Sequence, residues 1–128
     1  MRTSDLLYLS IAEIHHKIKN KEICPSDLID ASFQQMARSE KTVKAFLYVD
    51  EERAMHLAKQ LDQKLMTARE HISPLFGLPY GIKDNICTQG IPTTCASKAL
   101  DGYLPPLDGT IYRRLVEANT VLGGKCNM

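Results

Sequence analysis

Three features are scarce in this 128-residue sequence: excess charge of one sign, closely paired cysteines and long apolar runs. Its 16 Lys and Arg side chains nearly balance its 15 Asp and Glu side chains, which leaves a formal net charge of only +1. This balance gives no chain-wide electrostatic attraction for a nucleic-acid backbone or an anionic membrane. Any contact with nucleic acid is therefore expected to be local or indirect. Length and composition predict one domain, without internal repeats.

The four cysteines are scattered and form no C-x-x-C pair; they are Cys24, Cys87, Cys95 and Cys126. Their spacing supports neither a metal cluster nor a disulfide framework, and it favours a reducing compartment. No segment approaches the roughly 18 apolar residues of a membrane span, and no small-residue cleavage pattern follows the apolar start of the chain. The sequence alone therefore predicts a cytoplasmic protein without membrane contact or a bound metal.

The chain up to about residue 70 has the pattern of a helical segment. Ser10 and Glu13 have the spacing of a capping box, which predicts a helix to about Asn20. Pro25 begins a second helix, with an expected apolar face of Leu28, Ile29, Phe33 and Met36. Asp50 can cap a third helix, with an expected buried stripe of Ala54, Leu57, Ala58, Leu61 and Leu65.

Three short runs rich in β-forming residues predict strands, at residues 43–49, 80–83 and 120–123. The middle run follows a Gly- and Pro-rich loop, and Lys83 is expected where that strand ends. Strands that alternate with helices predict an α/β layer.

Residues 88–108 contain several Gly and Pro residues, which predicts an irregular connection. Asp108 or Thr110 is expected to cap the next helix, which runs to Ala118, and Asn119 is expected to adopt a left-handed conformation after it. The sequence stops soon after the last predicted strand, with nothing to cover it, so we expect the chain to be incomplete relative to its fold.

Five ordered motifs follow the third helix. They are Gly-Leu-Pro-Tyr-Gly-Ile-Lys-Asp-Asn-Ile at 77–86, Gly-Ile-Pro-Thr-Thr-Cys-Ala-Ser at 90–97, Leu-Pro-Pro-Leu-Asp-Gly-Thr at 104–110, Arg-Leu at 114–115 and Gly-Lys-Cys-Asn-Met at 124–128. Together they resemble the amidase signature family. The sequence departs from the family pattern at Tyr80-Gly81, Asn119 and Cys126. The resemblance is specific mainly from Gly77 onward.

The resemblance implies the N-terminal part of a mixed sheet flanked by helices, with a helical segment over about 1–70 and a lysine-bearing core over about 71–128. It also implies a Ser-cisSer-Lys mechanism, in which a neutral lysine takes a proton through a bridging serine from the nucleophilic serine. Lys83 matches this general base. Both serines belong to a Gly-Gly-Ser-Ser-type segment that these 128 residues lack. Ser97 is not one of them.

Lys83 must lose about three units of pKa, or about 4 kcal/mol, to act as a base near neutral pH. The apolar neighbours Ile82 and Ile86 are expected to contribute by burying it. The adjacent carboxylate of Asp84 would have the opposite effect. In extended backbone it should point to the other face and bind loop amides.

Four residues match the loop that supports the family's lysine: Asp84, Asn85, Thr94 and Ser97. The resemblance gives Ser97 a structural role, as a hydroxyl that fixes the loop near Lys83, rather than direct catalysis.

Within the family, the wording around Lys83 and Thr94 most resembles tRNA-dependent amidotransferases. That likeness implies glutamine as substrate, partner subunits B and C, tRNA contact mainly through the second of these partners, and ATP and magnesium for the whole complex, with no cofactor bound by this chain. Without the serines, these 128 residues alone are expected to be inactive. Two alternatives remain: a stand-alone amidase of the same family, and a non-catalytic assembly or interaction module.

Other candidates have simpler interpretations. Residues 119–126 superficially resemble a phosphate loop, but Asn119 and Cys126 stand where that motif needs Gly and Ser or Thr. Gly123 and Gly124 are instead expected to form a tight exit from the last strand. The four histidines have no partners at a recognised metal-ligand spacing. Arg113 and Arg114 are expected to lie on a solvated helix face.

Overall fold

A computed structural model describes residues 3–68 and 71–128. The helices of this part are η1 (Thr3–Tyr8), α1 (Ile11–Lys19), α2 (Pro25–Val43), α3 (Glu51–Thr67), η2 (Lys98–Leu100) and α4 (Thr110–Glu117), where η denotes a 3-10 helix. The strands are β1 (Phe46–Val49), β2 (Pro79–Lys83) and β3 (Val121–Cys126). The expected boundary near residue 70 falls on residues 69 and 70, which lie outside the described residues.

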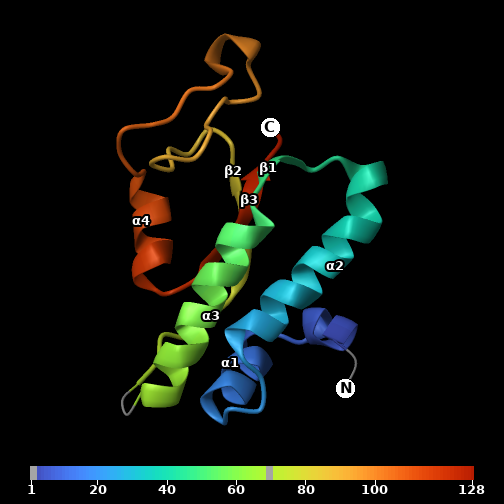
Figure 1. The fold of residues 1–128 in the computed structure, drawn as a ribbon, viewed down its shortest axis with the longest axis vertical. Helices are drawn as coiled ribbons and strands as arrows, with labels where there is room; N and C mark the ends of the chain where they lie inside the picture. Colours follow the sequence, from blue (N-terminus) through green and yellow to red (C-terminus); the bar gives the residue numbers. More distant parts are fainter. Residues whose placement is uncertain (1–2, 69–70) are drawn as a thin grey trace.

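The three strands form a mixed sheet with β3 in the centre, as predicted for the α/β class (Figure 1). β1 pairs with β3 in antiparallel fashion, and β2 pairs with β3 in parallel. Lys83 is the register partner of Cys126 in the parallel pair. The carboxyl ends of β2 and β3 therefore lie at one edge of the sheet, and the segment 84–109, yellow to orange in Figure 1, lies over that edge.

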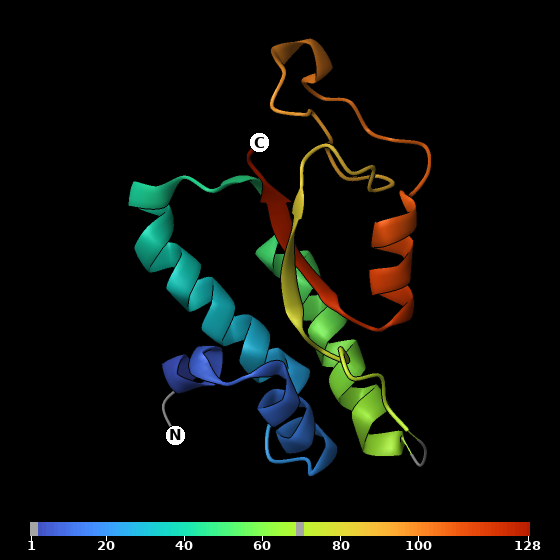
Figure 2. The same ribbon diagram turned by 180° about the vertical axis from the view of Figure 1, so that it is seen from behind.

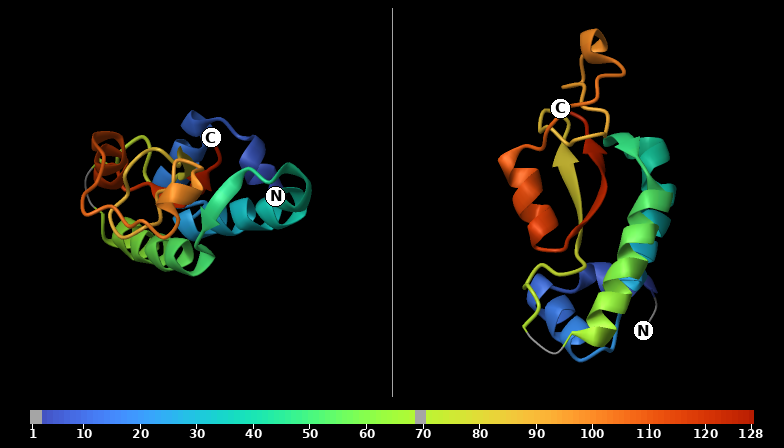
Figure 3. Two further views of the ribbon diagram at one scale, coloured as in Figure 1. Left: turned by 90° about the horizontal axis from the view of Figure 1, so that it is seen from above. Right: turned by 60° about the vertical axis from the view of Figure 1, so that its left-hand side comes forward.

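Helices cover the sheet from several sides. α2 and α3 pack against each other and contact β3, while α4 stands on the far side of the strands from α2 (Figures 1 and 3). Seen from behind, η1 and α1 lie below the sheet beside the start of α2 (Figure 2). The main core consists of Leu6, Ile14, Ile18, Ile23, Leu28, Ile29, Phe33, Ala54, Ala58, Leu61, Leu65, Phe76 and Val121.

The predicted caps of the first and third helices are confirmed. The Ser10 hydroxyl accepts the Glu13 amide at 3.3 Å, and the Glu13 carboxylate accepts the Ser10 amide at 2.7 Å, so both arms of the capping box are present. The Asp50 carboxylate accepts the Arg53 amide at 2.9 Å. These bonds satisfy amides that the first helical turns leave without a backbone partner.

Some element boundaries differ from the predictions. Residue 43 belongs to α2, so β1 begins only at Phe46. The residue before α4 is Gly109, which has no side chain for capping, because the Asp108 carboxylate accepts the Gln89 amide at 2.7 Å instead. Asn119 does have a left-handed backbone, with φ of 59°.

Two packing predictions were wrong. Leu57 is 37% exposed and lines a cleft between α3, β3 and α4, so the buried stripe of α3 consists of the other four residues expected there. Gly123 and Gly124 lie inside β3, and the strand continues to Cys126. A Cβ atom on Gly124 would lie 2.6 Å from the Tyr48 carbonyl oxygen of β1, so the absence of a side chain allows the two strands to approach.

Candidate active site

Lys83 is the last residue of β2, and its side chain is exposed. The next turn closes when the Ile86 amide donates to the Lys83 carbonyl at 3.0 Å, and it leaves Asn85 exposed. The expected apolar burial of Lys83 is therefore absent from the described residues. The reason is the alternation of side chains along the strand, because Ile82 is buried on one face while Lys83 points to the other.

Asp84 lies on the buried side of the same turn and is only 1% exposed. One of its carboxylate oxygens accepts the Thr94 amide at 3.0 Å and the Thr94 hydroxyl at 2.5 Å. Its carbonyl oxygen accepts the Cys95 amide at 3.1 Å. Asp84 thus binds a loop amide, as expected, and it joins the end of β2 to the second motif.

The second motif forms a tight turn at Thr94–Ser97. Cys95 and Ala96 both have positive φ, of 51° and 54°, which is unfavourable for residues with a side chain. The Ser97 amide donates to the Thr94 carbonyl at 2.8 Å, and the Ser97 hydroxyl accepts the Ala99 amide at 3.3 Å. The hydroxyl of Ser97 therefore caps η2 within its own loop, while Thr94 makes the direct bond to Asp84.

Lys125 on β3 is a buried polar residue that the motifs did not single out. Its side chain is completely buried, and its ammonium nitrogen lies 3.5 Å from the Asp84 carboxylate. The nitrogen donates to the Ile86 carbonyl at 3.0 Å, to the Thr88 hydroxyl at 2.9 Å and to the Thr93 hydroxyl at 2.8 Å, and the Pro92 carbonyl lies at 3.5 Å. We call these four loop oxygens and the Asp84 carboxylate the Lys125 cradle.

The hydrogen-bond pattern of the cradle requires a charged lysine. An ammonium has three protons and no acceptor, which matches the three close oxygens. The Thr93 hydroxyl donates in turn to the Ile91 carbonyl at 3.2 Å, and the Thr88 hydroxyl lies 3.2 Å from that of Thr93. Burial lowers the pKa of Lys125, and the Asp84 carboxylate opposes that shift. The pair places two opposite charges in the interior without net charge.

A signal for Lys125 was present in the sequence. Its strand, Val121–Cys126, contains two glycines and otherwise mostly apolar residues, as a strand covered on both faces does. A lysine in such a strand must be buried, and therefore needs several oxygen partners. The Gly-Lys pair had been interpreted only as a possible phosphate loop.

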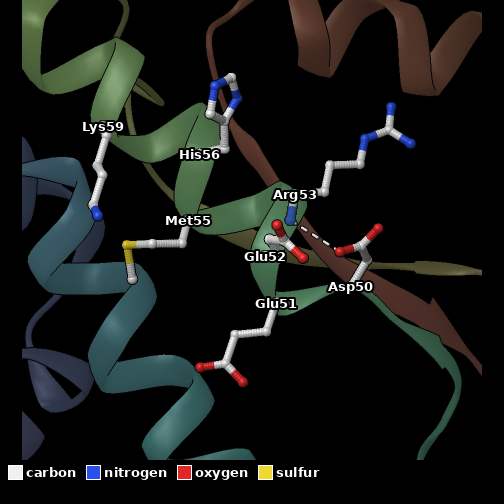
Figure 4. Close-up of a pocket in the computed structure, with 7 residues that line it drawn as sticks. All are labelled: Asp50, Glu51, Glu52, Arg53, Met55, His56 and Lys59. Carbon is white, nitrogen blue, oxygen red and sulfur yellow. Dashed lines mark hydrogen bonds between the residues drawn. The ribbon is translucent and has the colours of Figure 1, made fainter.

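The widest surface hollow lies elsewhere, at the start of α3, and has a volume of about 790 Å³. It is lined by Asp50, Glu51, Glu52, Arg53, Met55, His56 and Lys59 (Figure 4). In Figure 4 the side chains of Glu51, Arg53 and Lys59 spread in different directions instead of converging. None of the residues predicted for the site lines this hollow, which we regard as an open surface of the helix end.

Among residues 3–68 and 71–128, no group of three or more His, Cys, Asp or Glu side chains is placed to hold a metal ion. All four cysteines are free thiols. No helix within these same ranges is long and apolar enough to cross a membrane.

Comparison with known proteins agrees with the motifs. The family model described as Amidase matches residues 27–128. The chain belongs to the amidase signature family.

The curated relatives include the A subunits of glutamyl-tRNA(Gln) amidotransferase from two bacteria. The protein of Synechococcus elongatus is 45% identical over 119 residues, and that of Geobacillus kaustophilus is 48% identical over the same length. Each match covers 93% of this chain, but only 25% and 24% of the relative. The chain therefore spans about a quarter of the length of these relatives.

Solved structures confirm the fold. The peptide amidase of Stenotrophomonas maltophilia superposes with a TM-score of 0.84 at 28% identity, over 93% of this chain and 24% of that enzyme. An amidase family protein from Bacillus anthracis gives a TM-score of 0.87 over 98% of this chain and 25% of its own, and at 24% identity it bears on the fold alone.

Proposed function

We propose that this chain supplies the general-base lysine of a glutamine amidohydrolase, the ammonia-supplying subunit of a glutamyl-tRNA(Gln) amidotransferase. The complex would convert Glu-tRNA(Gln) to Gln-tRNA(Gln) with glutamine and ATP. Support comes from the identity of 45–48% to the A subunits of such enzymes and from the ordered motifs around Lys83. The chain's place in such a complex implies partner subunits B and C. We assign tRNA contact mainly to the B subunit, and ATP and magnesium to the complex.

In this proposal Lys83 accepts a proton through a bridging serine from the nucleophilic serine. The serine attacks the side-chain amide carbon of glutamine, ammonia leaves, and water later releases glutamate from the acyl-enzyme. Lys83 needs an accessible amine for this role, and its side chain is exposed at the carboxyl end of β2. Neither serine is in the 128 residues, so both belong to the rest of the protein in this proposal.

The observation that carries the proposal is the arrangement of the two neighbours at the end of β2. Lys83 is exposed, whereas the Asp84 carboxylate is buried, bonded to Thr94 and paired with Lys125. A free carboxylate beside Lys83 would favour its charged form. The turn keeps this carboxylate away from the amine, and the remaining decrease in pKa is assigned to substrate and to protein that covers Lys83 in the whole enzyme.

The test uses the whole protein expressed from its gene together with subunits B and C. Glutamine-dependent ammonia release is measured for the natural protein and for Lys83→Met, which removes the amine but keeps a side chain of similar length. We expect a loss of about 10²- to 10⁴-fold in rate, typical for the removal of a general base. Exposed Lys41 on α2 supplies a matched control, because Lys41→Met should leave the rate unchanged. Normal turnover of Lys83→Met would refute the proposed role.

A second candidate, a stand-alone amidase, is favoured by the likeness to the peptide amidase. The same purified protein, without subunits B and C, would then hydrolyse other amides through Lys83, and it would not co-purify with those subunits. A non-catalytic module would bind partners while Lys83→Met changed no rate. In all three cases, the 128-residue chain alone is expected to release no ammonia from glutamine, because a catalytic unit without its nucleophile loses nearly all activity.

A further inference from the structure

One buried charged group has no part in the proposed mechanism. Lys125 is fully buried, although lysine is among the residues least often found inside proteins. Burial of an ammonium costs several kcal/mol unless hydrogen bonds and an opposite charge compensate. The structure provides both, from residues of a single loop.

The cradle fastens that loop at several points. Oxygens of Ile86, Thr88 and Thr93 accept the three ammonium protons, at 2.8–3.0 Å. The loop begins directly after Lys83, so a side chain of β3 fixes the segment that leaves β2. The two strands are already neighbours in the sheet, and Lys83 is the register partner of Cys126, the residue after Lys125.

The cradle also carries an electrostatic consequence for Lys83. Asp84 follows Lys83 directly, and its negative charge would raise the pKa of the neighbouring amine. The Lys125 ammonium lies 3.5 Å from that carboxylate. From the position of Lys83, the two opposite charges nearly cancel. Removal of either partner leaves the other uncompensated beside the proposed base, with opposite effects.

We propose that Lys125 is a positioning residue, whose buried ammonium neutralises Asp84 and holds the loop 84–93, so that the amine of Lys83 can lose its proton. This inference rests on the proposed function of Lys83. Lys125 does not contact substrate in this role; it acts through Asp84 and the loop.

The test compares Lys125→Met, Asp84→Asn and the double variant in the whole protein with its partner subunits. Ammonia release is measured against pH, because the alkaline rise of the rate reports the deprotonation of Lys83. We expect Lys125→Met to move this rise to higher pH and Asp84→Asn to move it to lower pH, each by about half a pH unit or more. The double variant should return the rise toward its natural position. A purely structural pair would lower the rate without opposite shifts.

Two further measurements keep the test independent of folding and of the activity itself. If Lys125→Met is insoluble, Asp84→Asn alone must still shift the profile to lower pH, and Lys125→Arg, which keeps the charge, must leave its position unchanged. The titration of the Lys83 side chain by NMR in the 128-residue chain must show the same opposite directions even if glutaminase activity is absent. Shifts in one direction, or no shift, would overturn the role of Lys125; a silent Lys83→Met with opposite NMR shifts would instead overturn the proposed function.

Discussion

Gly124 should be the least replaceable residue of the central strand. A Cβ atom built on it lies 2.6 Å from the Tyr48 carbonyl oxygen and 2.7 Å from a ring carbon of Phe46, both on β1. Ordinary contact begins near 3.4 Å, so Gly124→Ala requires β1 to retreat by about 3.4 − 2.6 = 0.8 Å. Such a shift lengthens hydrogen bonds of about 2.9 Å beyond their effective range. β1 is a short strand at the edge of the sheet, with pairing only to β3.

The magnitude follows from two effects. Overpacking costs about 1–3 kcal/mol, and each weakened ladder bond costs about 0.5–1.5 kcal/mol. The loss of backbone freedom in the unfolded chain offsets roughly 0.5–1 kcal/mol. We therefore expect Gly124→Ala to lower the free energy of unfolding by about 2–4 kcal/mol.

The adjacent glycine provides a matched control. The nearest atom to a Cβ on Gly123 is the Tyr80 carbonyl oxygen, at 3.4 Å, so Gly123→Ala should change stability by less than about 1 kcal/mol in either direction. Urea unfolding of the 128-residue chain, followed by circular dichroism, measures both variants. Equal stability of the two alanine variants would refute the close approach of β1 and β3 that this reasoning uses.

Two further predictions concern stability. Burial, and next the neighbouring Tyr112, raises the pKa of Tyr80 above its usual value near 10. The unfolded chain therefore loses this proton first as pH rises, so stability is fully present below about pH 10 and decreases above it by up to about 1.4 kcal/mol per pH unit; Tyr80→Phe should make the decrease shallower in urea unfolding at pH 9–11, and an unchanged slope would contradict it. Asp50→Ala removes the carboxylate that accepts the Arg53 amide and should cost about 1 kcal/mol, whereas Asp50→Asn, which can still cap, should cost clearly less in the same assay.

Local signals in the sequence predicted much of the fold. Ser10, Glu13 and Asp50 act within three residues of their partners, so a short pattern determines the helix starts. The left-handed Asn119 is likewise a local property. The cap of α4 was predicted wrongly because the competing partner of Asp108, the Gln89 amide, is 19 residues away in the sequence. A contact over that distance leaves no local pattern.

The candidate site was predictable only in part, for the same reason. Motifs located Lys83, Asp84 and Thr94, and extended backbone predicted that Asp84 would turn away and bind loop amides. The partner of Asp84 across the sheet was not predictable from spacing, because Lys125 reaches it only after β2 and β3 pair in parallel. The exposure of Lys83 follows from which face of β2 the helices and loops cover. That information belongs to the assembled sheet.

The order of the strands in space also bears on how the protein is made. β3 is the middle strand of the sheet, yet it is the last of the three to leave the ribosome. Until residues 121–126 emerge, β1 and β2 have no strand to pair with, and β1 must wait for more than 70 residues of synthesis (121 − 49 = 72). Closure over such separations is slow compared with helix formation. We therefore expect the nascent chain to acquire its helices early and its sheet in a single late step, with a need for chaperone protection in between.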